Sequence, residues 1–62
     1  MNFQVGDLLQ YEERLHKKPF IKHCIVLEAN SSSGIVYWFS GVAKEFKQHV
    51  KWISIYGTYR KL

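Results

Sequence analysis

The longest hydrophobic pattern in the chain covers residues 20–40. Two runs rich in β-branched and aromatic residues, 20–29 and 35–40, flank the polar segment 30–34, which ends in glycine. This arrangement is typical of a β-hairpin whose loop is longer than two residues. Because most residues in both runs are apolar, both faces of the predicted hairpin favour burial. The chain itself can cover one face, and a partner is a candidate to cover the other.

The segment before the hairpin is predicted to contribute one strand and one loop. The tripeptide at 5–7, Val-Gly-Asp, indicates a tight turn, since glycine permits a positive φ and aspartate can bond its own backbone. A first strand over 8–11 follows. Residues 12–19 are charged and end at Pro19, which cannot donate to a ladder, so they are predicted to form a loop. A marginal helix over 11–18 is the alternative.

Residues 42–53 fit two periodicities. As a helix they would align one apolar stripe, formed by Val42, Phe46, Val50 and Ile53. As a strand, alternate residues form two faces, of which one includes Trp52 and the other carries more charged side chains. We favour the strand because it completes a compact all-β unit. Residues 52–56 are then predicted to form the last strand, and 57–62 a basic tail.

The spacing of these elements predicts an all-β fold. Five short strands with turns about every ten residues favour a small five-stranded barrel, because closing the sheet removes exposed edges. The 62 residues make a single domain, 1–62. A chain this short buries only about 60% of its unfolded surface, so small folds often add a disulfide, a metal or oligomerisation. The single cysteine, Cys24, excludes an internal disulfide and fits a reducing compartment, which favours oligomerisation or partner binding.

The charge of the chain is positive and unevenly distributed. Residues 1–15 carry three acids and one base, whereas residues 16–62 carry eight bases and two acids, and the net charge is +4. This balance suits a polyanionic partner, although it is also a common means of staying soluble. No stretch approaches the roughly 18 apolar residues of a membrane helix, and the N-terminus lacks the pattern of a signal peptide. We therefore expect a cytoplasmic protein with no membrane partner.

Four short motifs carry a resemblance to a known fold family. They are Val5-Gly6-Asp7-Leu8-Leu9, Ile25-Val26-Leu27-Glu28, Val36-Tyr37-Trp38 and Val50-Lys51-Trp52-Ile53. Together they resemble small SH3-like barrels of the KOW type, which are frequent among short tailed-phage proteins. One departure is Cys24, which stands where such proteins often have glycine, and a small cysteine is compatible with burial there. The resemblance implies an SH3-like barrel and a protein-binding, nucleic-acid-binding or virion role.

The resemblance also places Val26, Val36 and Trp38 inside the barrel. Alternation along the strands then assigns an apolar set to the outer face: Ile25, Leu27, Ile35, Tyr37 and Phe39. Exposed apolar patches of this kind mark interaction sites. The alternatives are that the two faces are reversed, or that the loop over 12–19 and the basic tail cover this side.

Lysines form the second candidate surface. Six are nominated for binding nucleic acid: Lys17, Lys18, Lys22, Lys44, Lys47 and Lys51. Interleaved with Tyr37, Phe39 and Tyr59, they could hold phosphates while the rings stack on bases. The alternative is a solvated lysine surface, which we favour because no arginine-rich run or RNA-binding motif is present.

No pattern indicates catalysis, a metal or a cofactor. His23 and Cys24 are adjacent in a strand and therefore point to opposite faces, and His16 and His49 are too scattered for a zinc site. The acidic residues form no pair, and a domain this small rarely encloses a ligand pocket of about 300 Å³ or more. We expect a non-catalytic, phage-encoded binding module that docks to a protein partner or to itself. Nucleic-acid binding is the alternative, and a minor structural role in the virion is a third.

Overall fold

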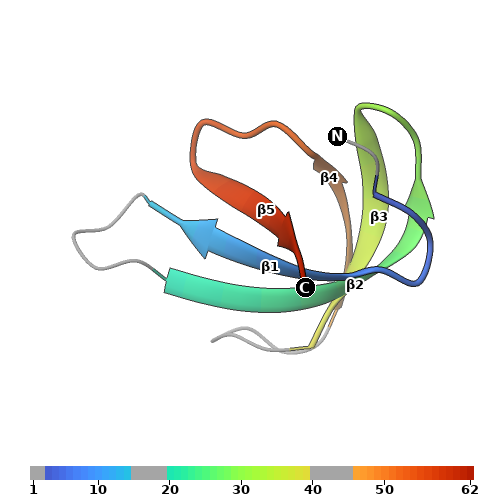
Figure 1. Cartoon of the computed structure of the whole chain (residues 1–62), viewed down its shortest axis with the longest axis horizontal. Helices are drawn as coiled ribbons and strands as arrows, with labels where there is room; N and C mark the ends of the chain where they lie inside the picture. Colours follow the sequence, from blue (N-terminus) through green and yellow to red (C-terminus); the bar gives the residue numbers. More distant parts are fainter. Residues whose placement is uncertain (1–2, 15–19, 40–45) are drawn as a thin grey trace.

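The computed structural model describes residues 3–14, 20–39 and 46–62, and these residues form one antiparallel five-stranded sheet. The strands are β1 (Leu8–Glu13), β2 (Phe20–Ala29), β3 (Ser33–Trp38), β4 (Phe46–Lys51) and β5 (Gly57–Lys61). Their order across the sheet is β4-β3-β2-β1-β5, and the sheet curves so that β4 and β5 border the same opening (Figure 1). The all-β prediction is confirmed, and no helix that could span a membrane occurs in the described ranges.

The inner face of the curved sheet carries the core. Its buried residues are Leu9, Tyr11, Cys24, Val26, Val36, Trp38, Val50, Trp52 and Tyr59. The rings pack edge to face or tilted, with Tyr11 and Tyr59 centroids 4.6 Å apart and Trp52 and Tyr59 centroids 5.8 Å apart. Such contacts add to the hydrophobic stabilisation that buried aromatic area provides. Val26, Val36 and Trp38 therefore lie inside, as predicted.

A bulge in β2 shifts its alternation. Val26 pairs with Val36, but the next partner pair is Glu28 with Ile35, so Leu27 is the extra residue. A bulge of this kind moves the following side chains to the opposite faces. Consequently Ala29 packs against the core instead of pointing outward.

The predicted end of the chain is wrong. Residues 52–56, expected as the last strand, connect β4 to β5 and make a single bridge, Ile53 to Thr58. The expected basic tail contains β5, which pairs with β1. The loop expected over 12–19 is also wrong at its start, because Glu12 and Glu13 belong to β1 and have partners on both sides; residues 15–19 lie outside the described ranges. Pairing with two neighbours outweighs the low strand propensity of glutamate.

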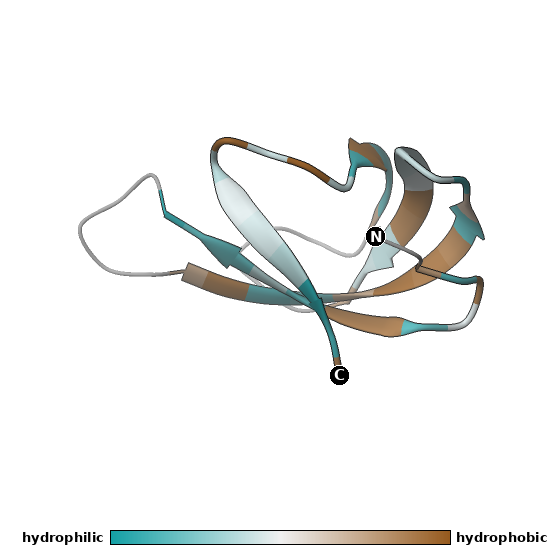
Figure 2. Ribbon diagram, turned by 45° about the horizontal axis from the view of Figure 1, so that its top comes forward, coloured by the Kyte–Doolittle hydropathy of each residue, from teal (hydrophilic) through white to brown (hydrophobic). Residues whose placement is uncertain are grey.

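The helix alternative for 42–53 is also wrong over its described part, since Phe46–Lys51 is the strand β4; residues 42–45 lie outside the described ranges. Figure 2 shows hydrophobic residues concentrated on β2 and β3, whereas β4 and β5, at the two ends of the sheet, are more polar. Within the described ranges β4 and β5 do not pair with each other, and the bridge from Ile53 to Thr58 joins only the connecting segment to β5, so the sheet is open between β4 and β5.

Candidate functional site

The outer face of the sheet carries a row of apolar side chains. Leu8 of β1 lies opposite Ile25 of β2, which lies opposite Tyr37 of β3. These three and their neighbours define the outer patch: Leu8, Ile25, Leu27, Ile35, Tyr37 and Phe39. Five were predicted from the sequence, and the structure brings them together. Leu8 was missed because its place opposite Ile25 follows from the pairing of β1 with β2, which no local signal reveals.

Side chains of the outer patch are accessible to different degrees. Leu8, Phe39 and Leu27 are 46%, 43% and 36% exposed, whereas Ile25, Ile35 and Tyr37 are half-buried by their neighbours. The ring of Phe39 stacks on His23, with centroids 6.4 Å apart and planes 21° apart. The patch therefore combines accessible edges with rings that are already held in place by neighbouring side chains.

Basic side chains border the outer patch along β4. Lys47 pairs with Tyr37, His49 with Ile35 and Lys51 with Ser33, so all three lie on the outer face. Lys47 and Lys51 therefore share a face of the strand with His49. Tyr59, in contrast, is a buried inner residue and cannot stack with bases beside them. Lys17, Lys18 and Lys44 lie outside the described residues.

Lys22 lies on the inner face, opposite to the face that carries Lys47 and Lys51. Its ammonium is 5.3 Å from the ring centroid of Trp38 and 5.7 Å from that of Tyr11, and it forms an ion pair of 3.9 Å with Glu13. Cation–π contacts of this kind are worth about 0.5–1 kcal/mol at partly exposed sites. Lys22 thus covers the end of the aromatic core and is already engaged with a carboxylate.

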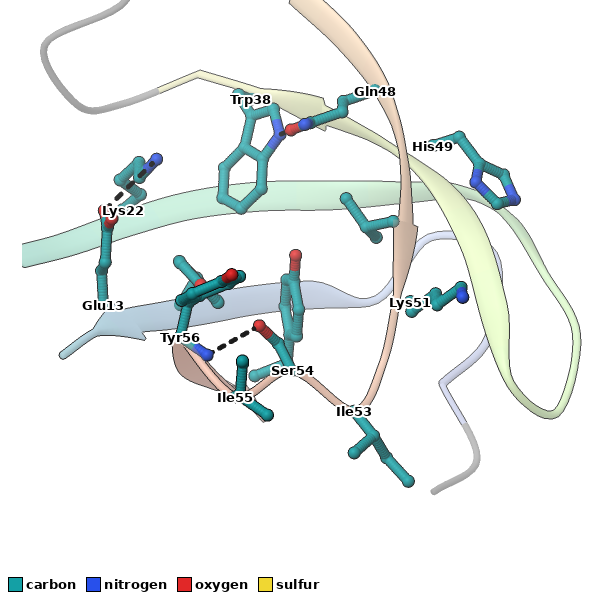
Figure 3. Close-up of a pocket in the computed structure, with 13 residues that line it drawn as sticks. Glu13, Lys22, Trp38, Gln48, His49, Lys51, Ile53, Ser54, Ile55 and Tyr56 are labelled. Atoms are coloured by element: carbon teal, nitrogen blue, oxygen red, sulfur yellow. Dashed lines mark hydrogen bonds and ion pairs between the residues drawn. The ribbon is translucent and has the colours of Figure 1, made fainter. Parts of the chain in front are cut away.

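A groove of about 510 Å³ opens on the inner face (Figure 3). Its lining includes Tyr11, Trp38 and Tyr59 from the core, the pair Lys22 and Glu13, residues 48–51 of β4 and residues 53–56. The Trp38 indole N–H donates to Gln48 Oε1 at 2.8 Å. Ile53 and Ile55 are 87% and 89% exposed. The groove is open to solvent between β4 and β5 and is not an enclosed pocket of the kind judged rare in so small a domain.

Two neighbouring residues of β2 point to opposite faces, as predicted. Cys24 is fully buried on the inner face, and burial raises the pKa of its thiol to about 12. His23 stacks on Phe39 outside. They cannot act jointly on a substrate or a metal. Among the residues the structure describes, no group of three or more His, Cys, Asp and Glu side chains is placed to hold a metal ion.

No family model, curated protein or solved structure matches the chain. Function is therefore inferred from the surfaces of the molecule itself: the outer patch, its basic border on β4 and the groove on the opposite face.

Proposed function

We propose that the chain is a non-catalytic docking module that binds a protein partner through the outer patch. The observation that carries this proposal is the continuous row of Leu8, Ile25 and Tyr37 across three paired strands, with Phe39 exposed beside it. Protein interfaces combine a charge-poor, aromatic-rich centre with a polar rim. The outer patch supplies the centre, and Lys47 and Lys51 supply part of the rim.

The described lysines favour a protein over a nucleic acid as the main partner. Nucleic-acid affinity depends on several cations that reach phosphates together. Lys22 lies on the opposite face and is paired with Glu13, which leaves Lys47 and Lys51 beside the rings of the outer patch. A protein with an apolar contact surface and acidic neighbours fits this arrangement better than a phosphate backbone does.

The proposal includes the type of fold and its setting. The strand order, the short strands and the motifs that resemble KOW-type modules support an SH3-like barrel left open between β4 and β5. The same resemblance supports a phage-encoded protein that works in the cytoplasm of an infected host, with a virion role as the alternative. Because folds of this type serve many functions, the proposed docking role rests on the outer patch and not on the fold.

The test is affinity capture from nuclease-treated extract with the wild type and with the double variant Tyr37→Ser, Phe39→Ser. We expect the wild type to retain a protein that the double variant loses, because the aromatic anchors of an interface contribute most of its binding energy. Val5→Ser is the matched control, since Val5 is 68% exposed and lies outside the outer patch. Sedimentation of the purified proteins tests whether the partner is a second copy.

Other results would contradict the proposal. Retention of the same protein by the double variant would show that the outer patch is not the contact. If nuclease removes all captured material, and binding to an oligonucleotide falls with salt by a log–log slope of roughly −0.7 to −0.9 per phosphate contact, nucleic acid is the partner instead.

A further inference from the structure

One edge of the strand β4 has no partner strand among residues 3–14, 20–39 and 46–62. The strand pairs with β3 on one side and ends the sheet on the other. Trp52 N–H donates to Ser32 O at 3.0 Å, and hydrogen-bonded pairs recur at every second position of an antiparallel ladder. The backbone groups of residues 46, 48 and 50 therefore face β3. Those of Lys47, His49 and Lys51 face away from the sheet.

Bonds on the far side of β3 support this assignment. Asn30 N–H donates to Ser33 O, and Phe39 N–H donates to His23 O. The odd-numbered positions of β3 thus bond to β2, which leaves its even-numbered positions for β4. Three residues of β4 consequently offer an N–H donor and a C=O acceptor each to an added strand.

The same edge borders the groove. Gln48 and Val50 of β4 line the groove, and so do Ile53 and Ile55 beyond the end of the strand. A strand added beside β4 would direct every second side chain to this inner side. Apolar side chains at those positions would cover Val50 and the two exposed isoleucines.

The outer side of the edge has the opposite chemistry. Lys47, His49 and Lys51 project there, and no acidic residue of β4 lies among them. Opposite charges facing each other across two strands are stabilising, and like charges are destabilising. The outward side chains of an added strand would therefore be acidic.

We propose that β4 receives an extended segment of another protein in which acidic and apolar residues alternate. The acidic side chains face Lys47, His49 and Lys51, and the apolar ones enter the groove. This is addition of a strand to a sheet edge, in which backbone bonds supply affinity and alternate side chains supply specificity. The site shares Lys47 and Lys51 with the rim of the outer patch, but strand addition at the edge does not require docking at Tyr37 and Phe39.

The charges argue against two other occupants. Pairing of β4 with β4 of a second copy around His49 would place Lys47 opposite the lysine at position 51, which is a repulsive arrangement. No described segment of the chain itself alternates acidic and apolar residues. Lysines on an edge also deter neutral strands, which leaves an acidic strand of another protein as the occupant.

The test uses a blocked peptide of about seven residues that alternates glutamate and valine, long enough to span β4. Amide hydrogen exchange of the protein is measured with and without the peptide. We expect the amides of Lys47, His49 and Lys51 to exchange rapidly in the free protein and slowly in the complex. Amides of Gln48 and Val50, already bonded to β3, should change little.

Two proline variants separate edge pairing from general attraction. His49→Pro removes a donor that faces away from the sheet and obstructs the edge, a position where proline is tolerated. Lys61→Pro is the matched control on β5: Leu62 N–H donates to Leu8 O, so the Lys61 N–H also faces away from its neighbour. We expect His49→Pro to weaken peptide binding at least about tenfold and Lys61→Pro to leave it unchanged, both with wild-type dispersion of amide signals.

Three results would overturn the proposal. The first is undetectable binding of the glutamate–valine peptide at low salt. The second is equal binding of a glutamate–serine peptide, which would show attraction to charge without use of the groove. The third is undiminished binding to folded His49→Pro. If the double variant Tyr37→Ser, Phe39→Ser keeps the protection pattern but loses its captured partner, the edge site and the outer patch act separately, as proposed.

Discussion

The thiol of Cys24 lies at the centre of the inner face, between Leu9 and Trp38 in the pairing register. It is fully buried, and its raised pKa keeps it protonated at neutral pH. Because the thiolate is the reactive form, we expect a thiol reagent to label native protein only as fast as it unfolds. Labelling rates measured across a denaturant series should follow the unfolding rate. Fast labelling of the native state would place Cys24 outside and reverse the faces of β2.

Burial of the same thiol predicts a loss of stability at alkaline pH. In the unfolded chain the thiol ionises near its ordinary pKa of 9.0, whereas in the folded protein the pKa is about 12. The buried, protonated thiol therefore contributes its full stabilisation below pH 9. As the pH rises from 9 toward 12, the free energy of unfolding falls by about 1.4 kcal/mol per pH unit. Burial, with Tyr11 and Cys24 nearby, also raises the pKa of Tyr59, which extends the loss above pH 10. Denaturant titrations between pH 8 and pH 10 test this by giving the free energy of unfolding at each pH. Cys24→Ala should remove the decrease of this free energy between pH 9 and pH 10.

Gly34 is required because Trp52 lies directly against it. A Cβ at this position would collide with the Trp52 ring and with the backbone carbonyl of Glu28. A carbonyl in a strand cannot move as a flexible side chain can, so we expect Gly34→Ala to lower the free energy of unfolding by about 1–3 kcal/mol. Chemical denaturation gives the value, with Ser31→Ala in the adjacent loop as the control. A change within the error of that control would contradict the packing described for Trp52.

At the scale of elements, Asn30 organises the turn between β2 and β3. Its side-chain oxygen accepts hydrogen bonds from the N–H groups of Ser32 at 3.1 Å and Ser33 at 2.9 Å. Asn30→Ala should therefore cost about 1 kcal/mol of stability, whereas Asn30→Asp keeps an oxygen acceptor and should cost much less. Thermal melting of the two variants makes the comparison. Equal losses would show that the turn does not depend on these bonds.

Elements with local signals were predictable from the sequence. The limits of β2 match the predicted range 20–29, because an apolar run ends there at the Asn-Ser turn. The hairpin loop predicted at residues 30–34 is held by the side chain of Asn30, although Ser33 and Gly34 belong to β3. Local hydrogen bonding and β-branched residues are visible in a short window of sequence.

Features that depend on distant pairing were not predictable. β5 is recognisable only through its partner β1, about fifty residues earlier in the chain. The bulge at Leu27 leaves no local mark, so the packing of Ala29 against the core could not be read from alternation alone. The groove was missed for the same reason: its lining comes from all five strands and the segment over 53–56, which meet only in the folded protein.

At the scale of the whole molecule, one sheet divides the hydrophobic residues between two faces with different roles. The inner face holds the two tryptophans at 4% exposure or less, and the outer face holds accessible apolar side chains. A 62-residue domain has little stability to lose. Its inner residues should therefore control folding and its outer residues binding.

The most direct measurement of this division is thermal melting, combined with partner capture, of Trp38→Ala and of the double variant Tyr37→Ser, Phe39→Ser. Trp38→Ala should lower the free energy of unfolding by about 3–5 kcal/mol, so this variant should be largely unfolded. The double variant should melt cooperatively as a folded monomer yet lose the captured partner. If instead the double variant unfolds while Trp38→Ala remains folded, the faces are inverted and the outer patch is the core.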